Sequence, residues 1–547
     1  MITISSMGRG SSAADYLTKK SEDYYSYDEI MPYTQFYDPN GLFGDELHNK
    51  NIIPEQFKNL CAGRHPNSAI SLTRSIGDQH KAGTDITFSV PKPVSVIHAL
   101  CGEKTRELVD EIHVKAVKRS LDFLTDKAGF TRYKVNNKVY HEKTNLLFGL
   151  FPHHESRSGD MQEHIHVAVL NICKNSSGNY SAIDSRPLFI WRGAAGARYN
   201  VDLAHGLMQQ AGIKCERDGR NFTCPVVPGE LNDYFSQRRR TIECVAKELK
   251  DHLKSKQHGI TTQMSDLAEN VLRQVPFLTP KQCDISDISN RHIATVISKI
   301  TRDKKVDCTH AQYLSLWEER ANASGVDLSF IDQVASRSLI RNTDPTVLSK
   351  IKAEIIRDTL VSLTEQKTVF SEPVLHEKIA EKSIGLLSID EVDEIYNQLN
   401  SFGDIVPIKK QANGLQLFTT VDQIKLELGI KNYLSEHETD FSHQIGIKEL
   451  AEDIRVFEAE QRKKTPSFKL SEEQKTAIVN VANVCGGVAA YEGIAGAGKS
   501  TIARVLANTY QRQGYKVMGY AFSKDAARVL EKRARLKNLW VPNRREW

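Results

Sequence analysis

The sequence predicts an α+β fold in which an antiparallel-sheet domain comes first, a helical middle with a winged-helix module follows, and an incomplete α/β phosphate-loop domain comes last. Three observations predict this. Short β-type runs of unequal spacing mix with long helical runs over about the first 230 residues, which is typical of an antiparallel sheet with helices packed on it. Helical, richly charged periodicity dominates from about 230 to 365. A Gly-rich loop then stands between an apolar run and a helical run.

The composition indicates a globular chain of several domains. Its 547 residues are 40% apolar and 26% charged, with a mean hydropathy of −0.42, and this length suggests roughly three or four domains. No apolar run approaches the roughly 18 to 20 residues that cross a bilayer, so we expect a cytoplasmic protein with no membrane insertion. Nine scattered cysteines without a CxxC pair indicate reduced thiols. The net charge of +5 is too mild to establish nucleic-acid binding.

The elements follow in order along the chain. We expect strands at TDITFSV (84–90), NLLFGLFPHH (145–154) and HIHVAVLNI (164–172), and long helices around 106–124 and 197–212. From about 366 to 430, helical runs alternate with a short hairpin, which is the pattern of a small winged-helix module. The apolar run GGVAAYEG (486–493) then predicts a strand, and TIARVLANTYQRQ a helix.

The stretch between that strand and that helix is a phosphate-binding loop. Gly493, Gly498, Lys499 and Ser500 match GxxxxGK[ST], whose backbone N–H groups wrap nucleotide phosphates while the Lys reaches them and the Ser ligates Mg²⁺. We therefore expect ATP with Mg²⁺ to bind here. The full set of expected nucleotide-binding residues is Gly493, Gly496, Gly498, Lys499, Ser500, Thr501 and Gln474.

The motor that this loop belongs to is expected to be incomplete. Phosphoryl transfer needs an acidic pair and an arginine finger, and nothing after AARVLEK supplies them. ATP binding is thus expected, whereas ATP-driven unwinding by this chain alone is not. The motor is either truncated or completed by another polypeptide.

A group of histidines forms the second candidate functional site. His164 and His166 alternate on one strand, so both imidazoles project from one face and can share a metal ion. His153 or His154, at the end of the neighbouring apolar run, supplies a third imidazole. Three imidazoles favour Zn²⁺, Ni²⁺ or Mn²⁺. Asp85, near the start of another strand, could orient a ligand imidazole or accept a proton.

A tyrosine-rich stretch, DYLTKKSEDYYSYDE, precedes these motifs. Its periodicity alone favours a helix that buries a few rings. The neighbouring metal site reverses this interpretation, because a metal that polarises a phosphate would let a phenol act as a nucleophile.

The chain resembles the MobF-type conjugative relaxase-helicases of the TraI/TrwC family. The resemblance rests on five features that follow each other in the same order, namely the tyrosine-rich stretch, the TDITFSVPKPVS strand, the HIH strand, the helical middle and the phosphate loop. The relaxase domain of that family is an HUH endonuclease. The last segment, with Gln474 and GYAFSKDAARVLEK, resembles the start of a RecD-like superfamily 1 helicase domain. The domains implied are a relaxase over 1–300, a helical connector over 301–365, a winged-helix-like module over 366–460 and the N-terminal part of a helicase over 467–547.

The resemblance implies a strand-specific DNA endonuclease and strand transferase. Tyr16 would attack the scissile phosphate at a transfer origin, leaving a 5′-phosphotyrosyl adduct that can be rejoined. Tyr24 would perform a second transfer, with Tyr25 in reserve and Tyr27 structural. The implied metal is Mg²⁺ or Mn²⁺. Single-stranded origin DNA, relaxosome accessory proteins and a type IV secretion coupling protein are the implied partners, in a bacterial cytoplasm.

The resemblance also bears on single positions. It matches Asp85 to an acidic residue beside the active tyrosine, and its Phe-x-His pattern selects His153 over His154. Two residues depart from the pattern. Leu17 stands where the family often has the second tyrosine of a doublet, and Glu163 replaces an apolar residue. Lys92, Arg192 and Arg238 to Arg240 are candidates for holding DNA.

Two alternatives compete with the relaxase hypothesis. One is a catalytically inactive remnant that binds ATP and DNA, which predicts no covalent DNA adduct. The other is a rolling-circle replication initiator, which uses related metal and tyrosine chemistry but does not need a RecD-like segment. The order of motifs disfavours the second.

Overall fold

The computed structural model describes residues 2–14, 17, 33–135, 138–156, 158–257, 264–275, 278–283, 291–300, 308–336, 344–365, 367–411, 414–494 and 496–521, together with the backbone of 537–540. The chain forms two compact units, Met1–Thr420 and Val421–Trp547. This boundary falls inside the segment 366–460 that the sequence predicts as one module, and the predicted domain boundaries stay predictions. None of the described helices has the length and apolar character to span a membrane.

An antiparallel sheet organises the first unit. Within the described chain it has five strands in the order β1-β3-β7-β6-β2, which confirms the predicted sheet. The three central strands, β3, β6 and β7, are those expected from the sequence. Their successive residues point to opposite faces of the sheet. Their bounds are β1 (Ile2–Ser6), β2 (Gln35–Tyr37), β3 (Gly83–Ser89), β6 (Phe148–Glu155) and β7 (Met161–Leu170).

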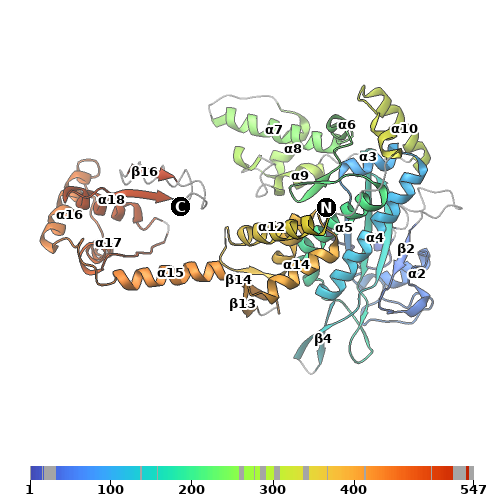
Figure 1. Cartoon of the computed structure of the whole chain (residues 1–547), viewed down its shortest axis with the longest axis horizontal. Helices are drawn as coiled ribbons and strands as arrows, with labels where there is room; N and C mark the ends of the chain where they lie inside the picture. The colour runs from blue at the N-terminus through green and yellow to red at the C-terminus, as the bar shows by residue number, and fades with distance from the viewer. Residues whose placement is uncertain are drawn as a thin grey trace. The chain divides into compact units, whose positions relative to one another are not determined.

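Each face of the sheet buries its own core. Ile165, Val167 and Val169 of β7 pack with the helices α3, α4 and α5 in the larger core. Ala168 and Leu170 point the other way and pack with Phe57 and residues from the N-terminal segment. Figure 1 shows α4 and α5 lying side by side. The helix bounds are α2 (Pro54–Cys61), α3 (Lys92–Leu100), α4 (Glu103–Ala128) and α5 (Arg186–Ala211).

The first unit also contains short two-stranded antiparallel ribbons and 3-10 turns. In the ribbons β4 pairs with β5, β8 with β9 and β10 with β11. Their bounds are β4 (Phe130–Val135), β5 (Lys138–Lys143), β8 (Cys173–Lys174), β9 (Tyr180–Ser181), β10 (Glu216–Asp218), β11 (Asn221–Thr223), η1 (Gly44–Glu46) and η2 (Gly77–Gln79).

The middle of the chain is helical, as predicted. Ser265, Thr309 and Asp344 cap the starts of α8, α10 and α12 with their side chains, which satisfies N–H groups that the helix leaves unpaired. The helices α7, α8 and α9 pack around a small hydrophobic core that is separate from the two cores of the sheet. The bounds are α6 (Gly229–Tyr234), α7 (Gln237–Gln257), α8 (Asp266–Gln274), η3 (Pro280–Cys283), α9 (Arg291–Ile300), α10 (His310–Ala323), α11 (Phe330–Ala335) and α12 (Pro345–Thr364).

Two helices and a small sheet follow, as the winged-helix pattern predicts. Ser388 and Glu391 form a capping box at the start of the second helix. Arg198 of α5 forms a bidentate ion pair with Asp393, with N–O distances of 2.5 and 2.8 Å, so this module packs within the first unit. The sheet order is β12-β14-β13. The bounds are β12 (Phe370–Ser371), α13 (Glu372–Ser383), α14 (Ile389–Ser401), β13 (Ile405–Lys410) and β14 (Gln416–Thr420).

The second unit carries the phosphate loop. The strand predicted at 486–493 is wrong, since these residues form no strand. A parallel strand needs a neighbouring strand for its backbone hydrogen bonds, and the described strands of this unit, β15 and β16, pair with each other. The bounds are α15 (Val421–His437), α16 (Ile447–Arg462), α17 (Glu472–Val479), η5 (Asn480–Val484), α18 (Lys499–Arg512), β15 (Met518–Ala521) and β16 (Lys537–Trp540).

Candidate active site

Three histidines meet on one face of the β6–β7 pair. His153 and His164 stand opposite each other in the register, and His166 stands opposite Phe151. The ring centroids lie 5.4 Å apart for His153 and His164, 5.2 Å for His153 and His166, and 5.1 Å for His164 and His166. We call these residues the front trio. The structure thus brings together the three imidazoles that the sequence predicts as metal ligands.

Asp85 holds one member of the front trio in place. Its carboxylate oxygens lie 2.9 and 3.1 Å from His166 Nδ1, and Thr87 Oγ1 lies 3.2 Å from the same atom. The opposite ring nitrogen, Nε2, then carries the lone pair, as a metal-ligating histidine requires. His164 Nδ1 donates in the same way to the carbonyl oxygen of Gln162 at 2.8 Å. Asp85 therefore has the contact expected of a residue that orients a ligand.

The tyrosines predicted as nucleophiles, Tyr16, Tyr24 and Tyr25, lie outside the described residues, as does Tyr27. Residues on either side of Tyr16 are described. Ala14 and Leu17 are buried in the smaller core together with Phe151 and Ala168, whose side chains share the face of the front trio. Leu17, the departure from the tyrosine doublet, is only 1% exposed. An apolar residue suits this position because it is part of the core.

The neighbouring residues His154 and Glu163 point to the other face of the sheet. Successive side chains of a strand alternate between its two faces, so His154 points away from the face on which His153 pairs with His164. Its Nδ1 lies 2.5 Å from Glu163 Oε2, and Glu163 Oε1 lies 3.1 Å from His98 Nδ1. Asp110 of α4 lies 3.0 Å from His98 Nε2. We call His98, Asp110, His154 and Glu163 the rear cluster.

Sequence reasoning missed half of the rear cluster. The sequence marks Glu163 as a departure from the family pattern and His154 as the alternative to His153, but His98 and Asp110 come from helices far away in the chain. The available signal was a histidine inside the apolar helical run KPVSVIHAL. Periodicity places such a residue in a core without saying which residue faces it.

Charge is tightly balanced in the rear cluster. Burial alone would lower the pKa of His98, but the charge of Glu163 and the contact with Asp110 outweigh it and raise that pKa to about 9. Burial would raise the pKa of Glu163, yet the charges of His154 and His98 hold it well below its usual value. Burial lowers the pKa of His113, which lies nearby on α4, to about 4. Buried imidazoles in one region thus have pKa values shifted in opposite directions.

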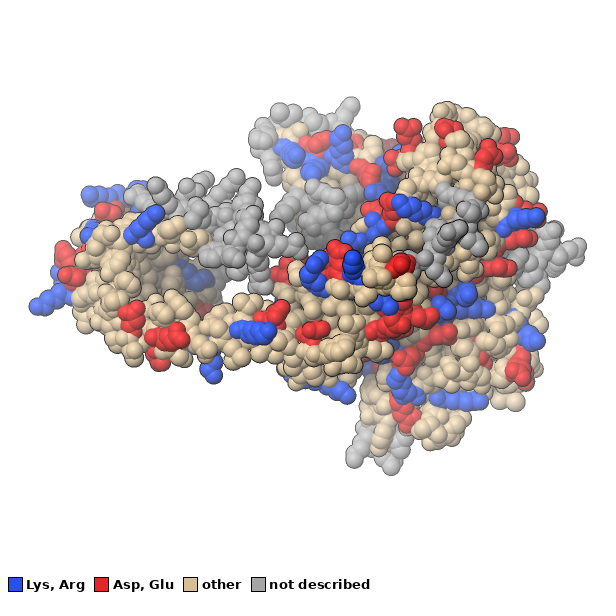
Figure 2. Space-filling model, viewed as in Figure 1, with Lys and Arg blue, Asp and Glu red and all other residues tan. Residues whose placement is uncertain are grey.

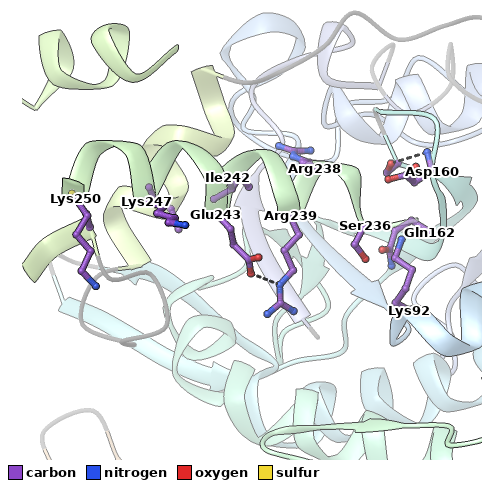
Figure 3. A pocket seen from close by; sticks show the side chains of 14 residues that line it. Lys92, Asp160, Gln162, Ser236, Arg238, Arg239, Ile242, Glu243, Lys247 and Lys250 are labelled. Atoms are coloured by element: carbon purple, nitrogen blue, oxygen red, sulfur yellow. Dashed lines mark hydrogen bonds and ion pairs between the residues drawn. The ribbon is translucent and has the colours of Figure 1, made fainter. Parts of the chain in front are cut away.

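A basic cavity of about 850 Å³ lies beside the start of β7. Figure 3 shows Arg238, Arg239, Lys247 and Lys250 along α7, with Lys92 beside Gln162 near the start of this helix. Asp160 anchors the start of α7 by accepting a hydrogen bond from Gln237 N at 2.8 Å. Gln162, whose carbonyl oxygen accepts a hydrogen bond from His164, also lines this cavity.

Some of the residues that the sequence suggests for DNA binding line this cavity and others do not. Lys92, Arg238 and Arg239 line the cavity, whereas Arg240 donates to Tyr234 O at 2.9 Å and Arg192 is exposed elsewhere. Burial lowers the pKa of Lys92 to about 8. Elsewhere the charges are mixed, and Figure 2 shows basic and acidic side chains interspersed over the face it draws.

The phosphate loop leads into α18. Gly498 adopts φ +84° and caps that helix, and Gly496 adopts φ +85°, a conformation that favours glycine. Lys499 Nζ donates to the carbonyl oxygens of Gly493 and Ile494. Gln474 Nε2 donates to Ala497 O at 3.0 Å, so this expected nucleotide-binding residue contacts the loop. Ser500 and Thr501 lie in the first turn of α18.

Comparisons with known proteins agree with this order of parts. A family model described as TrwC relaxase matches residues 10–324, and one described as AAA domain matches residues 469–538. The multifunctional conjugation protein TraI of Escherichia coli is 28% identical over 260 residues, covering 44% of this chain and 14% of that protein. The probable conjugal transfer protein TraA of Sinorhizobium fredii is 46% identical over 66 residues, covering 12% of this chain and 6% of that protein.

A solved structure of the conjugative relaxase TrwC in complex with oriT DNA, in its metal-bound form, is also similar. It has a TM-score of 0.45 and 23% identity and covers 60% of this chain and 99% of that chain. The chain spans only a small part of the length of the curated relatives it matches, 14% of the TraI protein named above.

Proposed function

Because this chain belongs to the TrwC relaxase family, we propose that it nicks one DNA strand at a transfer origin by metal-assisted tyrosine attack and rejoins it by strand transfer. The observation that carries the proposal is the front trio, three imidazoles on neighbouring strands with Asp85 fixing the ring of His166. Three nitrogen donors from one sheet face leave open positions for a substrate, as in catalytic rather than structural sites.

The donor set of the front trio fits a divalent metal. His153, His164 and His166 would hold it, and it would neutralise charge on the oxygens of the scissile phosphate. Asp85 keeps the proton of His166 on Nδ1, away from the phosphate. Mg²⁺ or Mn²⁺ is the proposed ion, with Zn²⁺ or Ni²⁺ as alternatives.

Tyr16 is the proposed first nucleophile. Its phenolic oxygen forms a bond to phosphorus while the bond to the 3′-oxygen breaks, which leaves a 5′-phosphotyrosyl link and a free 3′-hydroxyl. The tyrosine proton passes to a base, for which Asp85 is the candidate, and the leaving oxygen takes up a proton. Ala14 and Leu17, two residues before and one residue after Tyr16 in the sequence, are buried in the core on the face of the front trio, and this supports the choice. Tyr24 is proposed for the second transfer, with Tyr25 in reserve.

The basic cavity is the proposed path for the strand that reaches the front trio. Five cationic side chains line it, and Gln162 links it to His164. Phosphate groups would contact these cations without regard to base sequence. The cavity residues with positive charge are Lys92, Arg238, Arg239, Lys247 and Lys250.

The test incubates the full chain and Mg²⁺ or Mn²⁺ with single-stranded oligonucleotides from the candidate origin, and detects an adduct that survives SDS. Wild type should form the adduct, and Tyr16→Phe, His164→Ala or chelation should remove it. Tyr27→Phe is the matched control and should keep it.

Three outcomes contradict parts of this proposal. No adduct with any origin strand would favour a remnant that binds ATP and DNA. An adduct lost in Tyr24→Phe but kept in Tyr16→Phe would reassign the first nucleophile. An adduct only with a replication-origin strand would favour a rolling-circle initiator.

The AAA domain is proposed to bind ATP with Mg²⁺. Gly496 and Gly498 give the loop the backbone conformation that lets N–H groups face phosphates, at the start of α18. Lys499→Ala should abolish binding of a fluorescent ATP analogue, while Lys516→Ala, outside the loop, should not. Relaxosome accessory proteins and a type IV coupling protein are the proposed partners, in the bacterial cytoplasm.

A further inference from the structure

The rear cluster draws its side chains from four different elements. His98 comes from α3, Asp110 from α4, His154 from β6 and Glu163 from β7, and one potential ligand atom of each lies within 4.8 Å of the others. We propose that the rear cluster binds a divalent transition-metal ion of the zinc class, at a second site separate from the front trio.

The chemistry of the donors supports this. Two imidazole nitrogens and two carboxylate oxygens are ligand types that zinc takes in closed, four-coordinate sites. Zinc bonds of 2.0–2.2 Å place tetrahedral ligands about 3.3 Å apart. Glu163 lies 3.1 Å from His98 Nδ1 and 2.5 Å from His154 Nδ1, which is near that spacing. Asp110 contacts the opposite nitrogen of the His98 ring, Nε2, at 3.0 Å, so a rotation of that ring or of the Asp110 carboxylate would bring the fourth ligand to the same ion.

A second observation points to a ligand between these residues. His98 Nδ1 and Glu163 Oε1 are fully buried, and neither has a hydrogen-bond partner within the described part of the chain. They face each other at 3.1 Å as an ion pair, and a cation held between them would bind both atoms.

The charge of the site also suits a divalent ion. Two carboxylates carry two negative charges, which one such ion balances when both imidazoles are neutral. Two imidazolium groups would balance them equally, so the competing explanation is an ion-pair network only. The side chains of His98 and Glu163 are 0% and 3% exposed, whereas that of Asp110 is 25% exposed, which leaves an entry route.

A metal here would join α3 and α4 to the strands that bear the front trio. Glu163 directly precedes His164, and His154 directly follows His153. The role assigned to this ion is structural, because its ligands face the helices and not the basic cavity.

The experiment separates the two sites by stoichiometry. The full chain is loaded with excess Zn²⁺, desalted and assayed by elemental analysis. The front-null variant, with His153→Ala, His164→Ala and His166→Ala together, should retain about one zinc ion per chain. Adding Asp110→Asn and His154→Gln should remove it. A second loading with Co²⁺ should give weak d–d bands without thiolate charge transfer.

The control addresses the cysteines. Cys215 and Cys224 have sulfurs 4.0 Å apart, and Cys215→Ser with Cys224→Ser should leave the zinc content unchanged. A folded front-null chain that binds no zinc would show an ion-pair network only and overturn the proposal. This result does not depend on whether the rear variants fold, since the front-null chain leaves the rear cluster intact.

Discussion

The front trio and the rear cluster lie on opposite faces of the same two strands and are built from adjacent residues. His153 and His154 follow each other in β6, and Glu163 and His164 follow each other in β7. The front trio contacts the carboxylate of Asp85 through His166, and Gln162, which accepts a hydrogen bond from His164, lines the basic cavity. The rear cluster is packed by helices and contains two carboxylates. The difference teaches that strand alternation alone can direct chemically similar side chains to different tasks.

The largest effect is expected from removing the central charge of the rear cluster. Glu163→Gln leaves His98 and His154 without their shared carboxylate, so the free energy of unfolding should fall by about 3 to 5 kcal/mol. Urea denaturation measures it. Gln162→Ala, on the other face, is the matched control and should cost much less. Equal effects of both substitutions would break the comparison.

Substitution of His153 and of the adjacent His154 should affect the rate of adduct formation very differently. His153→Ala should slow adduct formation on origin DNA by about a hundredfold to a thousandfold, since such a loss follows removal of one charge-stabilising group at a reacting centre. His154→Ala should leave the rate nearly unchanged, measured per folded chain by single-turnover kinetics. If His154→Ala slows the reaction as much as His153→Ala, the two faces do not have separate tasks.

The electrostatic contrast predicts a pH dependence of stability. Burial lowers the pKa of His113 to about 4, although Glu163 and Asp110 oppose the shift. The unfolded chain therefore binds a proton near pH 6 that the folded chain does not, and stability falls with falling pH, by about 2 kcal/mol from about pH 6 to about pH 4.5. His113→Leu should reduce this slope by about one proton. An unchanged slope would show that His113 is protonated in the folded chain.

The smallest effect is expected at Asp85. Asp85→Asn keeps the shape but weakens the hold on His166, and changes in such supporting residues typically lower metal affinity about 10- to 100-fold. Titration with Mn²⁺ measures it at the front trio. Asp110→Asn is the matched change on the other face and should leave this affinity unaltered. An Mn²⁺ affinity that responds to Asp110 and not to Asp85 would reverse the assignment.

Much of the fold could be predicted because it depends on local pattern. The alternation in HIHVAVLNI and TDITFSV predicts central strands, and the structure confirms both in an antiparallel sheet. The strand predicted at 486–493 was wrong, because a strand also depends on a partner that the local pattern does not contain. The nucleophile assignment of Tyr16 stays a prediction, as Tyr16 lies outside the described residues.

By itself, the sequence determined that His164 and His166 share a face, that a glycine loop precedes a helix, and that the motifs follow a relaxase order. These are properties of spacing along the chain. Spacing along the chain left His153 and His154 open as the third ligand. The structure decides between them, because alternation along β6 turns their side chains to opposite faces and β7 pairs His153 with His164. It alone also brought His98 and Asp110 to Glu163, since helix packing joins residues that no spacing rule connects.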